Sequence, residues 1–594
     1  MSNVDMSMVS VLRTPVEMLR LRGARNSVLA MMKRTRLLHR IALSVAGCFA
    51  IACADRPAPD DLTEAGARAA DGALDEVIEG YVDLRRSGGG GSVDLSEESF
   101  LVAIDADRAL LEEARAVRPE GLSLEEDVDR RLLIALLESS VRSAEDRRRW
   151  KNDAALYVPS GALGRALDPE ATSSPPERAE RLAGVLAGLA EWLEQGRLNL
   201  DRPPRRFTEA AVFQTESTLG MLRDIGPSLA EEAGGDLDQA VDAGITALEG
   251  YLRFLEDDLL PRSDGDWAIG KVEYDFILQH RWFLDADADD ILERGRSAFD
   301  ETVLEAQEVA DRIAPGQHWV DVYERLKDDH PATDGIKQGY QDQMDAAQRF
   351  VIKHEVVSLP DGESVVTIDT PAAMRRSSPF GTFQSVGAFG EGLQGRLVLT
   401  PIEDWMTPEQ QAERLRSHHT AWLPVIAVHE AYPGHHVQAI KLRENPRILR
   451  KVVRESIFSE GWGLFTEELM FELGFLQGDD VRLTVLRNRL WRAARVILDV
   501  SLHTGGMSVE DAVDFLVEEV RFERYAAELE VDMYTRRATY VLGYLIGMQE
   551  IEAIREDYIE AFGEPSPPSQ LYDRLLRIGS IPPALVREEL LQGR

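Results

Sequence analysis

One eight-residue stretch constrains this chain more than any other: His429, Glu430, Ala431, Tyr432, Pro433, Gly434, His435 and His436. It holds three of the chain's 11 histidines, and an apolar run, Val425 to Val428, leads into it. Neutral imidazoles bind zinc, and a neighbouring carboxylate takes a proton from the activated water. The stretch therefore predicts a zinc hydrolase site on a buried helix, with His429 as a ligand and Glu430 as general base.

The spacing of the histidines differs from the common zinc-peptidase motif, in which the second histidine follows the first by four residues. Here that position is Pro433, followed by Gly434. A straight helix would turn His435 to the wrong side and place His436 about 10 Å along the axis, too far to share an ion bound at about 2.0–2.1 Å. Because proline and glycine interrupt helices, we expect a break here that returns one histidine to the metal.

Spacing alone does not decide which histidine returns. Two inserted residues would give His435 the role normally held four residues after the first ligand, so we predict His435 as the second ligand. His436 would then lie behind the ligands or face the substrate, with a role as alternative ligand left open. Packed core histidines at a kinked helix are the structural alternative.

A catalytic zinc site commonly has a third protein ligand. Glu460 and Glu467 lie two turns apart on one face of an otherwise apolar helix, too far apart to bind one ion together. Gly461, directly after Glu460, would let a second helix approach closely, so we predict Glu460 as the third ligand. Glu467 is predicted to orient a ligand, or to serve as an alternative one.

Two weaker patterns lie further along the chain. Arg495, Asp499 and His503 recur every four residues and share one helical face. A structural ion ladder is the default interpretation, and a proton relay or transition-state donor the alternative, with His503 as the catalytic candidate and Asp499 behind it. A phenol could also stabilise the oxyanion formed when water attacks a carbonyl. The tyrosines that could supply it, each also suited to core packing, are Tyr534, Tyr540 and Tyr544.

The octapeptide, with Val437 and Gln438 after it, resembles the signature of the bacterial family called domain of unknown function 885. The segment Ser459 to Glu467 is similar to the family's Glu-Gly-Trp-Ala-x-Tyr-x-Glu pattern, although Gly463 and Phe465 replace the usual Ala and Tyr. Further residues fall in family-like order and spacing: Arg495, Asp499, His503, Tyr540 and Gly543. The similarity extends over about 75–590.

The resemblance implies more than the residues do. The family is grouped with gluzincin-like zinc metallopeptidases, which are largely helical bodies with a small sheet flanking the metal helix. This implies His429 and a following histidine as ligands, Glu430 as general base, and a downstream glutamate as third ligand. It also implies that a strand such as 396–400 lines the cleft and pairs with an extended substrate.

The periodicity of the chain predicts a mainly α fold with a small β-sheet, at about 351–403, beside the metal-binding helix. From 97 to 350 apolar residues recur at helical spacing, most clearly in Glu177 to Glu194 and Leu237 to Leu255. Short β-branched or apolar runs predict the strands, at 356–359, 365–368 and 396–400. Helix resumes after Thr407 and again dominates from 435 to about 562. We predict an N-terminal helical region, 76–350, continuous with a metallopeptidase-like core region, 351–594.

The N-terminal part resembles a bacterial lipoprotein signal. A basic segment precedes an apolar run, Ile41 to Ala52, that is too short to span a bilayer. Both cysteines of the chain, Cys48 and Cys53, follow a small residue. We expect an upstream segment and signal peptide over 1–53, lipidation at Cys53 or Cys48, and a tether over 54–75. The alternatives are a plain secretory signal and a short buried helix. A lipid anchor would place the protein in the cell envelope.

Composition limits the classes of partner that this chain is expected to bind. The formal net charge is −37, and an acidic surface of that size repels nucleic acid and anionic membrane, so neither is expected beyond the lipid anchor. With no cysteine after Cys53, no disulfide framework or cysteine chemistry is expected. We predict a peptide or small amide substrate and Zn²⁺ as cofactor. The alternatives are a non-catalytic lipoprotein with a vestigial metal site and a metal-dependent hydrolase of non-peptide amides or esters.

Overall fold

The computed structural model describes residues 72–85, 94–168, 173–233, 237–370, 375, 381–390, 392–403 and 405–592. The predicted signal peptide and the lipidation at Cys53 or Cys48 lie outside the described residues. The predicted tether over 54–75 lies mostly outside them, and its last residues, from 72, already belong to a helix that runs to residue 85. Within the described part of the chain, no helix is long and apolar enough to cross a membrane.

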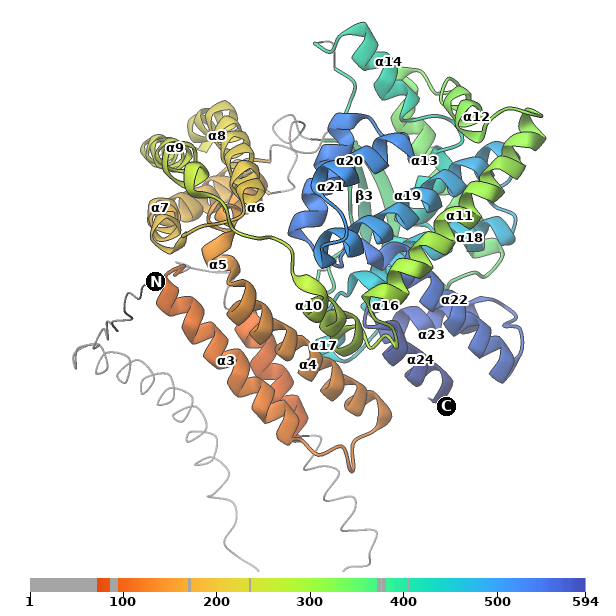
Figure 1. Ribbon diagram of the computed structural model, residues 1–594, viewed down its shortest axis with the longest axis horizontal. Coiled ribbons are helices and arrows are strands. Elements are labelled where there is room, and N and C mark those ends of the chain that lie inside the picture. The colour runs from red at the N-terminus through yellow and green to blue at the C-terminus, as the bar shows by residue number, and fades with distance from the viewer. Residues whose placement is uncertain are drawn as a thin grey trace, which may run out of the picture. The chain divides into compact units, whose positions relative to one another are not determined.

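The fold is mainly α with one small sheet, as the periodicity predicts (Figure 1). Before the sheet, the α-helices are α3 (Glu97–Ala116), α4 (Leu124–Arg142), α5 (Arg149–Asn152), α6 (Ser160–Leu167), α7 (Pro175–Asn199), α8 (Arg205–Ala233), α9 (Leu237–Phe254), α10 (Gly270–Phe276), α11 (Ala288–Ile313), α12 (Trp319–Leu326) and α13 (Ile336–Lys353). After it come α14 (Pro408–Arg416), α15 (Leu423–Ile426), α16 (His435–Leu442), α17 (Ile448–Val452), α18 (Ser456–Glu472), α19 (Asp479–Thr504), α20 (Val509–Glu518), α21 (Arg524–Arg536), α22 (Leu542–Phe562), α23 (Ser569–Ile578) and α24 (Pro583–Gln592).

Helices α6 to α9 enclose a hydrophobic core of their own. Helix α7 begins with a capping box between Ser174 and Glu177 and has proline in its first turn. Both are sequence signals for the start of a helix. Both of the clearest amphipathic segments predicted from the sequence are helices here, α7 and α9. They pack on each other and on α8 through leucines such as Leu186 and Leu248.

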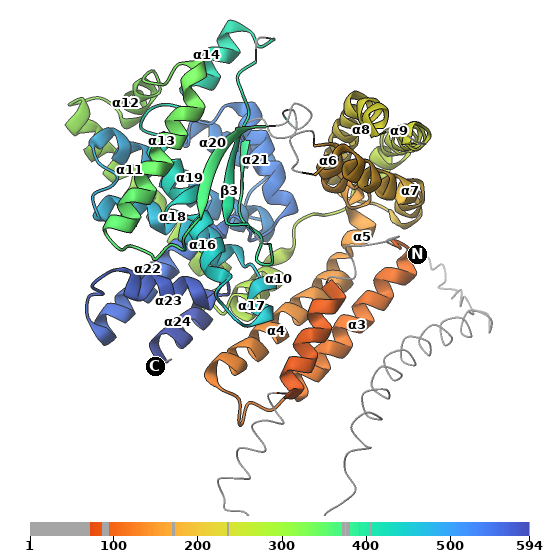
Figure 2. The ribbon, with the colours of Figure 1, turned by 180° about the vertical axis from the view of Figure 1, so that it is seen from behind.

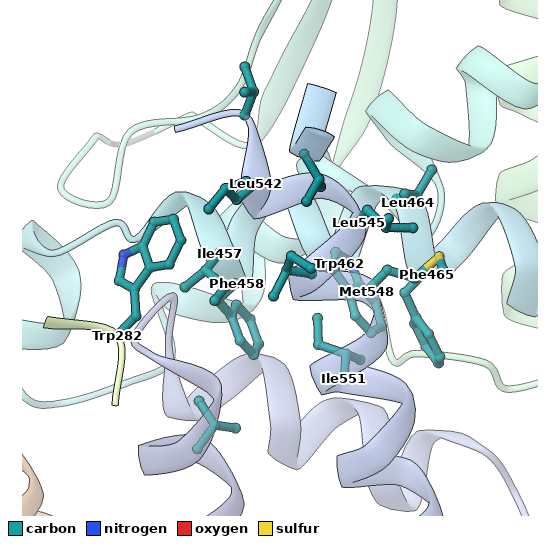
Figure 3. Close-up of a cluster of buried hydrophobic side chains, with 14 of the residues drawn as sticks. Trp282, Ile457, Phe458, Trp462, Leu464, Phe465, Leu542, Leu545, Met548 and Ile551 are labelled. Carbon is teal, nitrogen blue, oxygen red and sulfur yellow. The ribbon is translucent and has the colours of Figure 1, made fainter. Parts of the chain in front are cut away.

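The larger core runs from the helix at 72–85 to α24 and surrounds α18 and α22, which pack along each other. The two backbones touch at glycines: a Cβ on Gly461 would lie 2.4 Å from the carbonyl carbon of Gly547, and one on Gly547 would lie 1.9 Å from the Ile457 oxygen. Figure 3 shows the apolar side chains around this crossing, including Phe458 and Trp462 from α18 and Leu545 from α22. Helix α18, which carries Glu460, is thereby held tightly in place.

The sheet has three strands in the order β1-β3-β2: β1 (Ser364–Asp369), β2 (Gly381–Gln384) and β3 (Gln394–Leu399). β1 pairs with β3 in parallel and β2 pairs with β3 antiparallel. The predicted strands at 365–368 and 396–400 are present, whereas 356–359 is not a strand. Val356 and Val357 instead fill the core after α13, and the Ser358 amide donates to Asp573. The sequence prediction missed β2, whose residues are mostly polar or small.

Candidate metal centre

The octapeptide forms an interrupted helix. Helix α14 ends at Arg416, and the new helix α15 begins at Leu423 with Pro424 in its first turn. α15 widens into a π-helical segment, Ala427–Ala431, and Tyr432 is extended before α16 begins at His435. A Cβ on Gly434 would lie 1.8 Å from the carbonyl oxygen of His429, so only glycine lets the chain fold back this closely. The break expected from the Pro-Gly pair is present.

Trp462 holds this break against α18. Its indole N–H donates to the Pro433 carbonyl oxygen over 2.9 Å, and the side chain is fully buried. A buried tryptophan N–H needs such a partner, and the carbonyl left free by the interrupted helix supplies it. Because Trp462 lies two residues after Glu460, this bond fixes Glu460 relative to the octapeptide.

The structure brings three predicted ligands together: ligand atoms of His429, His435 and Glu460 all lie within 4.8 Å of one another. His435 Nε2 lies 3.4 Å from a carboxylate oxygen of Glu460. The two imidazole rings stand perpendicular, with centroids 4.9 Å apart. Both histidines are buried, and Glu460 is partly buried. Two imidazoles and one carboxylate converging on one point form the donor set of a three-ligand zinc site.

Glu467 lies behind His429. The Nδ1 atom of His429 lies 2.8 Å from a Glu467 oxygen, so Nδ1–H donates to the carboxylate and Nε2 is free for a metal. Glu467 is 1% exposed. Gly463, on the same helix, makes room for the ring, since a Cβ there would lie 2.8 Å from His429 Cε1. The glycine that departs from the family's usual alanine thus lies directly against the His429 ring.

The electrostatics of the three groups favour a charged carboxylate. Burial opposes ionisation of Glu460, but its hydrogen bond to His435 and that ring's charge hold the pKa of Glu460 at about 2. Burial lowers the pKa of His435, whereas Glu460 and, more weakly, Glu430 raise it above its ordinary value. Tyr540 donates its hydroxyl to the second oxygen of Glu460 over 3.1 Å. Glu430 lies beside His429 on the π-helical segment and is partly exposed.

His436 turns away from the three converging groups. Its Nε2 lies 2.9 Å from a carboxylate oxygen of Glu363, which also accepts from the Tyr432 hydroxyl at 2.7 Å. The ring packs against β3, where a Cβ on Gly395 would lie 2.6 Å from His436 Nδ1; Figure 2 shows β3 beside α16. Glu363 was not singled out in the sequence, because one acidic residue after a Gly turn carries no periodic signal.

Asp499 and His503, which are four residues apart on α19, bind different partners. Asp499 accepts from the Tyr274 hydroxyl at 2.5 Å and from the Thr539 backbone N–H at 2.9 Å. His503 Nε2 donates to the Tyr534 carbonyl over 2.9 Å. Among the described residues, neither side chain contacts the three converging groups by a hydrogen bond or ion pair. Asp499 is connected to this site indirectly. It binds the backbone N–H of Thr539, and the next residue, Tyr540, donates to Glu460.

The predicted pairing of an extended substrate with strand 396–400 is wrong for this fold. β3 is the central strand, with β1 aligned along Gln394–Leu399 and β2 along Arg396–Leu399. Its backbone groups on both sides are already used within the sheet, and only edge strands offer unpaired ones.

Comparison with known proteins gives a family and a fold. The model of the family described as "Bacterial protein of unknown function (DUF885)" matches residues 89–590. A solved structure from Shewanella oneidensis, described as a candidate lipoprotein of unknown function, aligns with a TM-score of 0.74 at 20% identity, covering 89% of this chain and 100% of that one. A candidate lipoprotein from Colwellia psychrerythraea aligns with a TM-score of 0.70 at 14% identity, covering 88% and 98%. No curated protein sequence gives a significant match. The chain therefore belongs to the DUF885 family of bacterial proteins.

Proposed function

We propose that this protein is a zinc-dependent hydrolase that cleaves amide bonds in peptides. The observation that carries the proposal is the convergence of ligand atoms from His429, His435 and Glu460 within 4.8 Å, with Glu430 adjacent. The relationship to gluzincin-like peptidases implied by the resemblance is part of this proposal.

The donor set fits zinc in its catalytic form. Three protein ligands leave a coordination position open, whereas structural zinc sites use four. Glu467 fixes the orientation of His429, as carboxylates behind zinc-bound histidines commonly do. A zinc ion held by His429, His435 and Glu460 would polarise the scissile carbonyl and lower the pKa of a water molecule.

Glu430 supplies the proton transfers. It accepts a proton from the attacking water and delivers it to the leaving nitrogen, as a general base and then a general acid. The water oxygen bonds to the carbonyl carbon and the C–N bond breaks, so the products are a carboxylic acid and an amine. The Glu430 carboxylate forms no hydrogen bond or ion pair with another described residue. It is therefore available for this role.

Tyr540 is the second catalytic candidate. Its hydroxyl lies 3.1 Å from Glu460, close enough to the metal ligands to donate to an oxyanion forming there. Asp499 holds the chain just before Tyr540 by accepting from Thr539, which has a left-handed φ of 69°. We therefore assign Asp499 as a positioning residue. His503, four residues further along α19, opposes the rise in the pKa of Asp499 that burial causes, so it acts on Tyr540 only through Asp499.

We also propose that the protein is anchored in the cell envelope by a lipid on Cys53 or Cys48. The apolar run before these cysteines supports this, and both structural relatives are described as candidate lipoproteins. Radiolabelled palmitate should be incorporated when the protein is expressed in bacteria. Cys53→Ala and Cys48→Ala variants identify the modified residue, and label retained in the double variant would exclude lipidation at these cysteines.

The activity is tested with the Glu430→Gln variant, which keeps the size of the side chain and loses its basicity. We expect zinc to be retained and the cleavage rate of a synthetic peptide mixture, followed by mass spectrometry, to fall at least about 100-fold. Glu409→Gln, an exposed glutamate of α14, is the matched control and should leave the rate unchanged. Bound zinc without turnover of any peptide in the wild type would contradict the proposal and favour a non-catalytic binding role.

A further inference from the structure

A cavity of about 520 Å³ adjoins the metal centre at the N-terminal end of α18. Glu460 and Tyr540 form part of its wall, so a molecule in the cavity touches the same groups that face the metal. Its volume falls within the range of about 300–1,000 Å³ typical of small-ligand sites. The cavity is therefore large enough for the end of a peptide chain.

Four arginines line this cavity, and two of them already lie within ion-pair distance of a carboxylate. Arg281 pairs with Glu455 at 2.8 Å, and Arg147 lies 3.9 Å from Glu273. The other two, Arg454 and Arg537, form no ion pair with any described residue and are exposed. In a chain with a net charge of −37, two uncompensated guanidinium groups in one cavity are unusual. They make this cavity attractive to an anion that the rest of the surface repels.

The cationic wall is directly connected to the metal centre. The Arg537 guanidinium lies over the Tyr540 ring, 4.0 Å from its centroid, and the Tyr540 hydroxyl donates to Glu460. Arg454 lies two residues before Ser456, the first residue of α18, and six residues ahead of Glu460. An anionic group held by these arginines would therefore lie close to a bond positioned at the metal centre.

We propose that Arg454 and Arg537 bind the C-terminal carboxylate of a peptide, so that hydrolysis removes a short C-terminal fragment. This proposal rests on the amide hydrolase activity proposed above and specifies its substrate class. Arginine suits the role because its planar guanidinium matches a carboxylate with two parallel hydrogen bonds. A carboxylate could also come from an aspartate or glutamate side chain, and the test separates the two sources.

The test uses the purified, zinc-loaded protein and synthetic peptides that differ only in ending with a free acid or an amide. We expect kcat/KM to be at least about tenfold higher for the acids, which corresponds to about 1.4 kcal/mol. Arg454→Met and Arg537→Met should each reduce the preference for acids over amides to less than about twofold, mainly by raising KM for the acids. Arg536→Met, the exposed neighbouring arginine that lies outside the cavity wall, is the matched control and should behave as wild type.

Equal cleavage of acids and amides would overturn the proposal while leaving the hydrolase intact. A preference for glutamate over glutamine within amidated peptides would also overturn it, by assigning the carboxylate to a side chain. If no peptide is cleaved, the hydrolase proposal fails, and binding of the dipeptide Ala-Phe by calorimetry still tests the cavity. The free acid should bind at least about tenfold more tightly than its amide, and the double arginine variant should lose this preference; equal affinities would overturn the cavity proposal.

Discussion

His435 and His436 are adjacent at the start of α16, yet their side chains face different groups. Successive helical residues point about 100° apart, so His435 faces His429 and Glu460 while His436 faces Glu363. The sequence offered two candidate histidines, of which we predicted His435, but only the path of the chain through Pro433 and Gly434 decides which one faces His429 and Glu460.

Glu467 is expected to control zinc affinity without touching the metal. In Glu467→Gln the hydrogen bond to His429 survives as a neutral one and the negative charge is lost, so zinc affinity should fall about 10- to 100-fold. Competition with a chromogenic chelator measures the affinity. Glu472→Gln, an exposed glutamate on the same helix, is the control. Equal zinc affinity in Glu467→Gln and wild type would remove Glu467 from the site.

At the scale of single residues, spacing predicted the converging groups better than it predicted their partners. The shared face of Asp499 and His503 is real, yet Asp499 binds Thr539 and His503 binds the Tyr534 carbonyl. These partners lie on distant segments, which helical periodicity cannot identify. Glu363 was missed for the same reason, since its importance comes from Tyr432 and His436 closing around it.

At the scale of elements, the crossing of α18 and α22 sets the position of Glu460. Gly461 and Gly547 let the two backbones touch, and the sequence predicted a close helix approach at Gly461 without identifying the second helix. The strands show a similar limit. Val356 and Val357 have strand-like composition but are buried in the core, whereas the polar β2 pairs because β3 offers it an edge.

Gly547→Ala should therefore damage both stability and the site. The added Cβ would lie 1.9 Å from the Ile457 oxygen, so α22 must shift away from α18, at a cost of at least about 1–3 kcal/mol. Urea unfolding followed by circular dichroism measures the stability, and zinc affinity should fall as well because Glu460 moves. Gly184→Ala in α7 is the control: nothing lies within 4 Å of its new Cβ, so it should be neutral or stabilising. Wild-type stability in Gly547→Ala would show that the helices are not packed as described.

At the scale of the whole molecule, a buried ionic cluster joins segments far apart in the sequence. Arg450, on α17, forms ion pairs with Asp129 of α4 and Glu589 of α24, and Arg447 also pairs with Asp129. Arg450 is fully buried. The mainly α fold could be predicted from periodicity because each helix carries its own apolar stripe. This cluster could not, because Arg450 lies 321 residues from Asp129 and 139 residues from Glu589 in the sequence, and only the folded chain brings them together.

Arg450→Met should be strongly destabilising. The substitution leaves Asp129 and Glu589 buried with less compensating charge, and breaking such a buried pair costs about 3–5 kcal/mol. The lost stability should appear as a lower urea midpoint of unfolding. Helices α4 and α24 should unfold in the same transition. Arg524→Met, at an exposed pair with Asp514, should change the midpoint little. An Arg450→Met midpoint equal to wild type would mean that the cluster does not hold these segments together.

The central claim, a metal site built from His429, His435 and Glu460, is tested most directly by the zinc content of two neighbouring variants. Wild type and His436→Gln should each retain about one zinc per chain after dialysis. His435→Gln should retain less than about a tenth of that, because His435 is assigned as a ligand and His436 is not. Circular dichroism confirms that both variants are folded. Full zinc retention in folded His435→Gln, or its loss in folded His436→Gln alone, would contradict the assignment.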